Sequence, residues 1–254
     1  MYSLETRKLC KTFGALTVAD NIDFRLEPGA RHALIGPNGA GKTTFVNMLM
    51  GALAPSSGEI LLGGEDVTRV AQSTRVRRGL ARTFQVTSLF RNLPVLDNVA
   101  LGIAERLGVA TRMWRPASAH REIIDEAREL LAALDLAGEA ATRVADLAYG
   151  KQRLVEIAIA LGLRPKVLLL DEPAAGVPRD ESTELFEVVS GLSRDITVLF
   201  IEHDMNFVFR FASRIIVMVG GRILTEGTPD EIAADPRVRE VYLGKGHGGS
   251  GRHG

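Results

Sequence analysis

The sequence predicts an α/β fold with a largely parallel sheet. Short apolar runs alternate with helix-like segments along most of the 254-residue chain, and this order is typical of parallel sheets covered by helices. One apolar run, HALIG (32–36), leads directly into a glycine-rich loop. Two later runs, VLLL (167–170) and ITVLFI (196–201), are further buried strands.

Helix caps and turns predict the other elements of this core. Gly51 closes a helix, because glycine readily adopts the left-handed conformation found at helix ends. Thr228 and Glu231 form a capping box with Pro229 at the first helical position, which begins a last helix. The elements predicted in this way are helices over 43–51, 180–192, 204–212 and 228–244, and a hairpin with a Gly-Gly turn over 215–227.

Residues 89–163 differ from the rest because they contain no convincing strand. Apolar residues in REIIDEARELLAALDL (121–136) share one face at helical spacing, which predicts a helical subdomain inserted into the core. The residues on this face are Ile123, Ile124, Ala127, Leu130, Leu131 and Leu134. We therefore predict a single domain over 1–244, with its core at 1–88 and 164–235, the helical subdomain at 89–163, and a flexible glycine-rich tail at 245–254.

Composition excludes several classes of function. The formal net charge is +0, so no bulk field attracts the chain to nucleic acid or anionic lipid. Cys10 is the only cysteine, which excludes an intramolecular disulfide and suits a reducing compartment. Charges stand where a signal peptide needs an apolar core, and no apolar run approaches the roughly 20 residues that span a bilayer. We expect a cytoplasmic chain that reaches any membrane through its partners.

The glycine-rich loop, GPNGAGKTT, fits the pattern G-x-x-x-x-G-K-[ST] between a strand and a helix. Its glycines let the backbone N–H groups face an anion, Lys42 adds a charge for the outer phosphates, and the Thr43 hydroxyl can ligate Mg²⁺. An accidental glycine-rich turn is the competing interpretation, and the strand–loop–helix context argues against it. The predicted nucleotide-binding residues are Gly36, Pro37, Asn38, Gly39, Ala40, Gly41, Lys42, Thr43 and Thr44.

A carboxylate pair ends the apolar strand in VLLLDEP (167–173). Ligands of parallel sheets lie at the carboxyl ends of the strands, so Asp171 can hold Mg²⁺ and Glu172 can orient or deprotonate a water. An isolated Asp-Glu pair is often a solvated strand end. A phosphate loop in the same chain makes the catalytic interpretation stronger, because phosphate-bound Mg²⁺ needs a carboxylate.

Three further motifs follow the loop in a fixed order: ARTFQ (81–85), LAYGKQR (147–153) and IEHDM (201–205). With the phosphate loop and DEP, this order resembles the nucleotide-binding subunit of ABC transporters from Leu4 to Gly244. A lone phosphate loop is shared by kinases, GTPases and helicases, whereas this combination is not. The resemblance implies a P-loop NTPase core with a mostly parallel sheet, an N-terminal antiparallel β portion and an inserted helical subdomain.

The resemblance also implies roles for single residues. Gln85 resembles the Q-loop glutamine that contacts Mg²⁺ or the attacking water, and His203 resembles the H-loop histidine that contacts the γ-phosphate. With Glu172 and Lys42 they form the implied catalytic set, and Thr43, Gln85 and Asp171 the implied metal set. Phe13 resembles the aromatic residue that stacks on adenine, although a place in the core is a serious alternative. Stacking recognises bases loosely, so it separates ATP from GTP only weakly.

The signature stretch departs from the commonest family form, LSGGQ. It consists of Leu147, Ala148, Tyr149, Gly150, Lys151 and Gln152. In the family this loop binds the γ-phosphate of a nucleotide held by the partner subunit. The lost serine hydroxyl is worth about 1.5–3 kcal/mol as a hydrogen bond to an anion, and we expect the backbone at Gly150 and the charge of Lys151 to offset part of it. LAYG and EGTPDEIAADPRVREVYLG (226–244) resemble the ATPases of branched-chain amino acid importers.

The implied function is the ATP-hydrolysing subunit of an ABC importer that uses ATP and Mg²⁺. Its partners would be a second ATPase subunit, integral membrane permeases and, indirectly, an external binding protein, at the cytoplasmic face of the inner membrane. Phe90 is a candidate permease contact, with a core role equally open, and Pro178 replaces an aspartate that many relatives direct at the partner. Alternatives are a lipid or lipopolysaccharide exporter, a soluble ABC ATPase acting on nucleic acid or ribosomes, and a nucleotide-binding regulator that does not hydrolyse.

Overall fold

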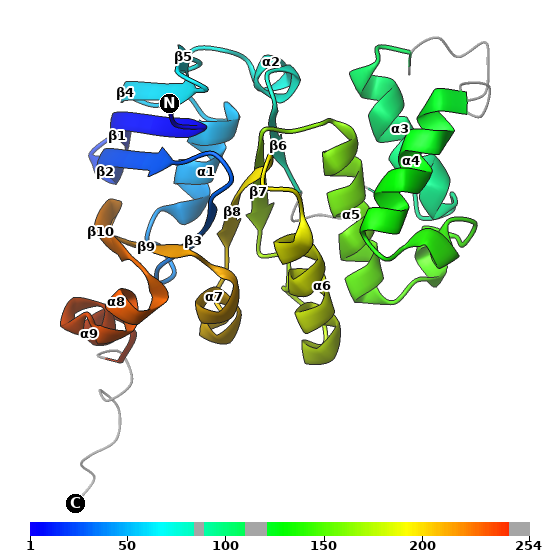
Figure 1. The fold of residues 1–254 in the computed structure, drawn as a ribbon. Helices are drawn as coiled ribbons and strands as arrows, with labels where there is room; N and C mark the ends of the chain where they lie inside the picture. Colours follow the sequence, from blue (N-terminus) through cyan, green and yellow to red (C-terminus); the bar gives the residue numbers. More distant parts are fainter. Residues whose placement is uncertain (84–88, 110–120, 244–254) are drawn as a thin grey trace, which may run out of the picture.

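Two β-sheets with helices packed around them make up the described residues, 1–83, 89–109 and 121–243, of the computed structural model (Figure 1). The larger sheet has the strand order β10-β9-β3-β8-β7-β6, and all of its strand pairs are parallel except β9 with β10. Its strands are β3 (Arg31–Ile35), β6 (Leu80–Arg82), β7 (Val167–Asp171), β8 (Thr197–Ile201), β9 (Arg214–Val219) and β10 (Arg222–Gly227). The predicted parallel sheet is confirmed.

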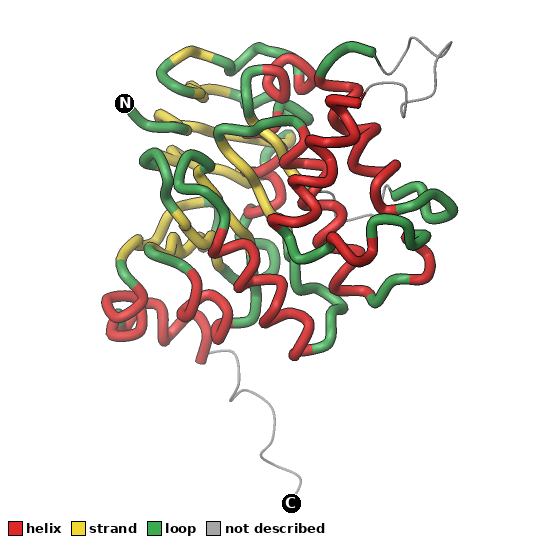
Figure 2. Tube along the Cα trace, turned by 45° about the vertical axis from the view of Figure 1, so that its right-hand side comes forward, coloured by secondary structure: helices red, strands yellow, loops and turns green. Residues whose placement is uncertain are grey.

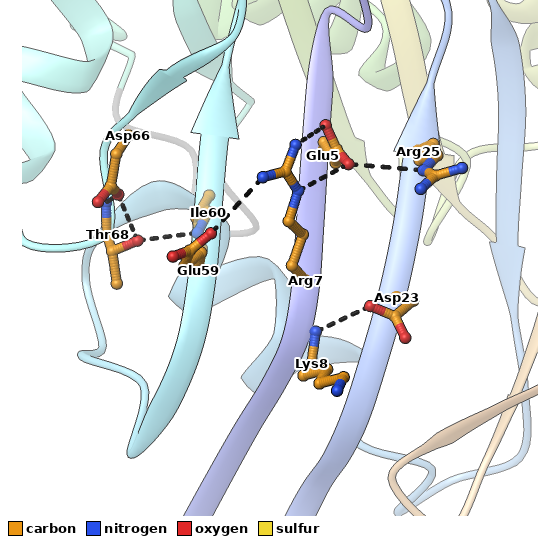
Figure 3. Close-up of polar contacts among 9 residues, drawn as sticks. All are labelled: Glu5, Arg7, Lys8, Asp23, Arg25, Glu59, Ile60, Asp66 and Thr68. Carbon is orange, nitrogen blue, oxygen red and sulfur yellow. Dashed lines mark hydrogen bonds and ion pairs between the residues drawn. The ribbon is translucent and has the colours of Figure 1, made fainter.

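The smaller sheet is antiparallel, as predicted for the N-terminal portion. Its order is β2-β1-β4-β5, with β1 Leu4–Phe13, β2 Leu16–Leu26, β4 Ser57–Leu62 and β5 Glu65–Asp66. Ion pairs link neighbouring strands across it: Glu5 of β1 lies 3.5 Å from Arg25 of β2, and Arg7 of β1 lies 3.8 Å from Glu59 of β4 (Figure 3). Opposite charges on adjacent strands favour this register.

The parallel strands are apolar at successive positions because both of their faces are buried. In β7, Leu168 and Leu170 belong to one hydrophobic core, and Val167 and Leu169 belong to the other. Side chains alternate across a strand, so each face of the sheet contributes to a different core. One core lies against helices that follow residue 94, and the other against α1 (Lys42–Met50) and the antiparallel sheet.

Helices flank the strands, and those of residues 89–163 stand together beside the sheet (Figures 1 and 2). α4 buries Ile123, Ala127 and Leu131, which confirms its predicted apolar face. The helices are α1 (Lys42–Met50), α2 (Gln72–Arg77), α3 (Val95–Arg106), α4 (Arg121–Ala133), α5 (Tyr149–Gly162), α6 (Arg179–Gly191), α7 (Met205–Phe211), α8 (Pro229–Ala234) and α9 (Pro236–Leu243), with short 3₁₀ turns at Ala137–Glu139 and Val144–Asp146. Within the described ranges, no helix is long and apolar enough to cross a bilayer.

The C-terminal segment is two helices, not the single helix expected over 228–244. The capping box is present, because the Thr228 side chain accepts from the Glu231 amide and the Glu231 side chain accepts from the Thr228 amide. The first helix nevertheless ends at Ala234, and Asp235 after it has extended backbone. Pro236 follows it and disfavours helical backbone at the preceding residue, so a second helix begins there.

The buried Arg75 of α2 forms hydrogen bonds both with the end of α1 and with the segment that precedes α2. Arg75 is 1% exposed, and it donates to Met48 and Leu49, at the end of α1, at 2.7 and 2.6 Å. It also donates to the carbonyls of Val70 and Thr68 at 3.0 Å each. Helix C-terminal carbonyls lack partners within the helix, and a cation there complements the helix dipole.

Replacing Arg75 with Met is expected to lower the free energy of unfolding by about 2–4 kcal/mol, because buried carbonyls lose their donors. Urea denaturation followed by circular dichroism measures this change. Arg77→Met is the matched control, since Arg77 lies on the same helix and is exposed. Equal stability of the two variants would show that the Arg75 contacts contribute nothing.

Candidate active site

The carboxyl ends of three neighbouring parallel strands bring most of the predicted site residues together. β3 leads into the phosphate loop, β7 ends at Asp171, and β8, which lies between them, is followed by Glu202 and His203. Open parallel sheets bind their ligands at this edge. A cavity of about 240 Å³ opens there. Its walls are formed by Val18, Asn38, Gly39, Ala40, Gly41, Lys42, Thr43, Thr44, Glu172, Ile201 and His203.

Two glycines of the phosphate loop allow close backbone approach. A Cβ atom at Gly41 would lie 2.6 Å from the Val18 carbonyl oxygen, and the residue has φ 97°, a conformation that favours glycine. A Cβ atom at Gly36 would lie 2.1 Å from the Met218 carbonyl oxygen. Side chains are therefore excluded at both positions, and α1 begins immediately after Gly41 with its N-terminus at the cavity.

Lys42 is largely buried, and its ammonium group is held by the loop itself. Its Nζ donates to the carbonyls of Gly36 at 2.6 Å and Pro37 at 3.1 Å. Burial lowers the pKa of Lys42, and the nearby carboxylates of Glu172 and Asp171 oppose part of that fall. The loop carbonyls therefore hold the ammonium in place at the phosphate-loop cavity, which Lys42 lines.

Asp171 is buried at the end of β7 and forms an ion pair with Arg82 at the end of β6. Arg82 also donates from Nη1 to the Asn47 side chain of α1 at 2.8 Å. This arginine neutralises a carboxylate that would be costly to bury alone. Sequence reasoning missed this role, although Arg82 stands within the ARTFQ motif.

Glu172 and His203 form the centre of the site. The Glu172 Oε1 atom lies 2.7 Å from His203 Nε2, and the Glu172 amide donates to the Ile201 carbonyl at 3.0 Å. Glu172 has φ 48°, which is unusual for a residue with a side chain and is a conformation that accumulates at functional sites. The pair stands between the phosphate-loop cavity and a second cavity of about 480 Å³, since both residues line both.

Glu202 joins the two loops that carry this pair. It is 4% exposed and accepts from the amides of Ala174 and His203, at 3.0 Å each. Burial raises the pKa of Glu202, and these backbone hydrogen bonds oppose the rise. Sequence reasoning did not select this residue, because a glutamate at a strand end carries no signal of burial.

The signature stretch begins α5 and lies apart from the phosphate-loop cavity, none of whose described lining residues comes from 147–152. Ala148 is the N-cap and makes no side-chain hydrogen bond. The Gly150 amide instead donates to Glu181 Oε2 of α6 at 2.7 Å. Gln152 Nε2 donates to the Leu147 carbonyl at 2.9 Å, which closes the loop on itself.

Lys151, whose charge was expected to offset part of the missing serine hydrogen bond, has an acidic partner within the chain. Its ammonium forms an ion pair with Glu139 in a 3₁₀ turn, and this pairing raises the pKa of Lys151. The charged group that contacts the Gly150 amide is an anion, Glu181. Tyr149 packs next to the loop after DEP, with its hydroxyl 2.9 Å from an Arg153 nitrogen.

Four other predicted positions have different outcomes. Gln85 lies outside the described residues. Phe13 is 51% exposed, with the Lys11 ammonium 5.0 Å from its ring centroid, so the alternative of a core position is wrong. Phe90 is 59% exposed, which also excludes a core role. Pro178 is the N-cap of α6.

Comparison with known proteins shows the family of this chain. Residues 19–175 match the family described as ABC transporter, and residues 222–248 match the one described as branched-chain amino acid ATP-binding cassette transporter. The chain belongs to the ABC transporter ATP-binding family. This ABC ATPase has the fold predicted from its sequence, and it is an ATP-hydrolysing subunit of an ABC transporter.

Several relatives resemble the ABC ATPase from end to end. The high-affinity branched-chain amino acid transport ATP-binding protein LivG of Escherichia coli is 37% identical over 95% of this chain and 98% of its own. BraF of Pseudomonas aeruginosa, with the same description, is 36% identical over the same shares. A nucleotide-free ATP-binding cassette superposes with TM-score 0.83 at 29% identity, covering 96% of this chain and all of that one. The ADP conformation of the ATP-binding cassette MJ1267 has TM-score 0.85 at 30% identity with equal coverage.

Proposed function

We propose that this ABC ATPase powers an importer of branched-chain or other hydrophobic amino acids, and that two such subunits enclose two ATP molecules. One observation carries the dimer: the phosphate loop, Glu172 and His203 share a cavity whose described lining contains no residue of the signature stretch. This separation supports a site that the partner's residues 147–152 complete. The substrate class rests on the names of the relatives and on the match at 222–248.

Each group in or near the cavity has a task in this proposal. The N–H groups of 36–44 and the Lys42 ammonium hold the phosphates, and Phe13 offers an exposed ring on which adenine can stack. His203 contacts the γ-phosphate. Glu172 orients the attacking water and accepts its proton, because its carboxylate projects into the cavity beside His203.

The donor set fits Mg²⁺, which prefers oxygen ligands. The Thr43 hydroxyl lines the cavity, and the buried Asp171 carboxylate lies at the adjacent strand end. We assign these two residues and Gln85 to Mg²⁺, which would neutralise charge on the phosphates. Asp171 would then be shared between the metal and Arg82, so the Arg82 ion pair limits how far this carboxylate can move.

The partners proposed are a second ATPase subunit, identical or related, and integral permeases at the cytoplasmic face of the inner membrane. Phe90 is a large exposed apolar side chain held near α3, since its amide and carbonyl both bond to the Asn98 side chain, at 2.9 and 3.1 Å. Exposed aromatic residues on a fixed backbone are typical anchors of protein interfaces. An external binding protein would deliver the substrate to the permeases.

Affinity purification from detergent-solubilised membranes tests this function. The tagged chain is expected to bring down permeases, and ATP hydrolysis by the reconstituted complex is expected to rise severalfold with leucine, isoleucine or valine and the binding protein. Stimulation by a lipid would favour an exporter instead. Recovery with ribosomes or DNA, and not with permeases, would contradict a transport function.

A further inference from the structure

The first turn of α5 is capped from another helix. Ala148 occupies the N-cap and has no side-chain acceptor, so the amides of the first turn need acceptors from elsewhere. Glu181, in the first turn of α6, supplies one to Gly150 at 2.7 Å. The Glu181 carboxylate thus acts as the hydrogen-bond acceptor in place of the hydroxyl that a serine at position 148 would provide. The two bonded residues are 31 positions apart in the sequence.

Only glycine permits this contact. A Cβ atom at Gly150 would lie 2.7 Å from Glu181 Oε2 and 2.9 Å from Glu181 Cβ. The carboxylate therefore sits directly against the backbone of the signature stretch, in a cavity of about 590 Å³ that also includes Glu184 and Glu187. Lys151 lines the same cavity, but Glu139 already holds its charge.

We infer that the Glu181 carboxylate accepts the hydrogen bond of the Gly150 amide in the separated subunit. The γ-phosphate of the partner's ATP then displaces this carboxylate and accepts the hydrogen bond in its place. This inference rests on the proposed function, in which the signature stretch binds that phosphate. One N–H cannot donate fully to two anions, and two anions in contact repel each other. ATP must therefore displace Glu181 for the dimer to close. ADP lacks the γ-phosphate, so Glu181 recaptures Gly150 after hydrolysis and favours reopening.

The test compares ATP-driven dimerisation of two variants that lose the same charge. Glu181→Gln keeps the size and an acceptor oxygen for Gly150 but removes the negative charge. Glu184→Gln is the matched control, one turn later on α6 and exposed. Both are made in a Glu172→Gln chain, in which hydrolysis does not dissolve the dimer. Sedimentation velocity then gives the ATP concentration at half-maximal dimerisation.

Glu181→Gln is expected to lower this concentration by about threefold to tenfold, and Glu184→Gln by less than about twofold. ATP affinity of the monomer, measured below the dimerisation range, is expected to stay the same for both. An unchanged or higher midpoint for Glu181→Gln, or equal shifts for the two variants, would overturn the inference. Dimerisation of the Glu172→Gln parent in such a case would leave the proposed function standing. Failure of that parent to dimerise with ATP would contradict both.

A second measurement separates two roles of Glu181: capping the first turn of α5 and competing with the γ-phosphate of the partner's ATP. Glu181→Ala removes the acceptor as well as the charge, so we expect a lower melting temperature than for Glu181→Gln together with a similarly lowered ATP midpoint. If Glu181 only supported the loop, the alanine variant would need more ATP than the parent. That result would also overturn the inference.

Discussion

Replacing Glu172 with Gln is expected to lower the turnover of ATP by about 10²- to 10⁴-fold, the usual contribution of a general base. The amide keeps the size of the side chain and a hydrogen bond to His203, but it cannot accept a proton. The Glu172 carboxylate lies 2.7 Å from His203 Nε2, and both residues line the phosphate-loop cavity. Phosphate release under saturating ATP measures the loss.

ATP affinity separates this catalytic effect from damage to the site. Binding of a fluorescent ATP analogue to the Glu172→Gln monomer is expected to stay within about twofold of the parent, because the loop and Lys42 hold the phosphates. Glu184→Gln serves as the control and should turn over normally, since Glu184 is exposed. Undiminished hydrolysis by Glu172→Gln would remove Glu172 from the base role.

Replacing Gly150 with Asp is expected to reduce turnover by at least about 100-fold, comparable to the loss of a donor to a developing anion. The new Cβ atom would lie within 3 Å of Glu181, and the first turn of α5 would have to shift. The added carboxylate would also repel both Glu181 and a partner phosphate. Steric and electrostatic effects therefore act in the same direction.

Monomer ATP binding is expected to survive this change, because the described walls of the phosphate-loop cavity contain no residue of 147–152. Gly138→Asp is the control: a Cβ atom there meets nothing within 4 Å, and the residue lies in the 3₁₀ turn at Ala137–Glu139. Gly150→Asp should bind ATP like the parent but neither dimerise nor turn over. Normal turnover in this variant would mean that 147–153 is an ordinary helix start.

The order of the elements was predictable because each signal is local. Strand β8 was readable from its continuous apolar run, and α1 from the loop before it and Gly51 after it. The C-terminal division at Asp235 was also locally encoded, since Pro236 marks it, but the strength of the capping box at Thr228 obscured it. Local sequence shows where a helix starts better than how far tertiary contacts and prolines let it run.

Some residues of the site were predictable from local sequence motifs, and others were not. Lys42, Asp171, Glu172 and His203 were predicted from motifs, because these motifs stand at strand ends or in the loop that follows one. Arg82 and Glu202 were not predicted. In the sequence, a charged residue next to an apolar strand looks the same whether it is exposed or buried, and only its partner in the fold distinguishes the two. The ion pair of Lys151 with Glu139 was not predictable for the same reason, since Glu139 is its neighbour only in the folded chain.

The sequence by itself determined the parallel sheet, the phosphate loop and the strand ends that carry the carboxylates, since hydrophobic periodicity and loop chemistry are properties of short segments. Only the tertiary structure decided what fills the place of the missing serine. The acceptor for the Gly150 amide comes from Glu181, on a different helix, and the space between them admits only glycine. Contacts between residues that are far apart in the sequence depend on how whole helices and strands pack, so no local sequence pattern predicts which residues meet.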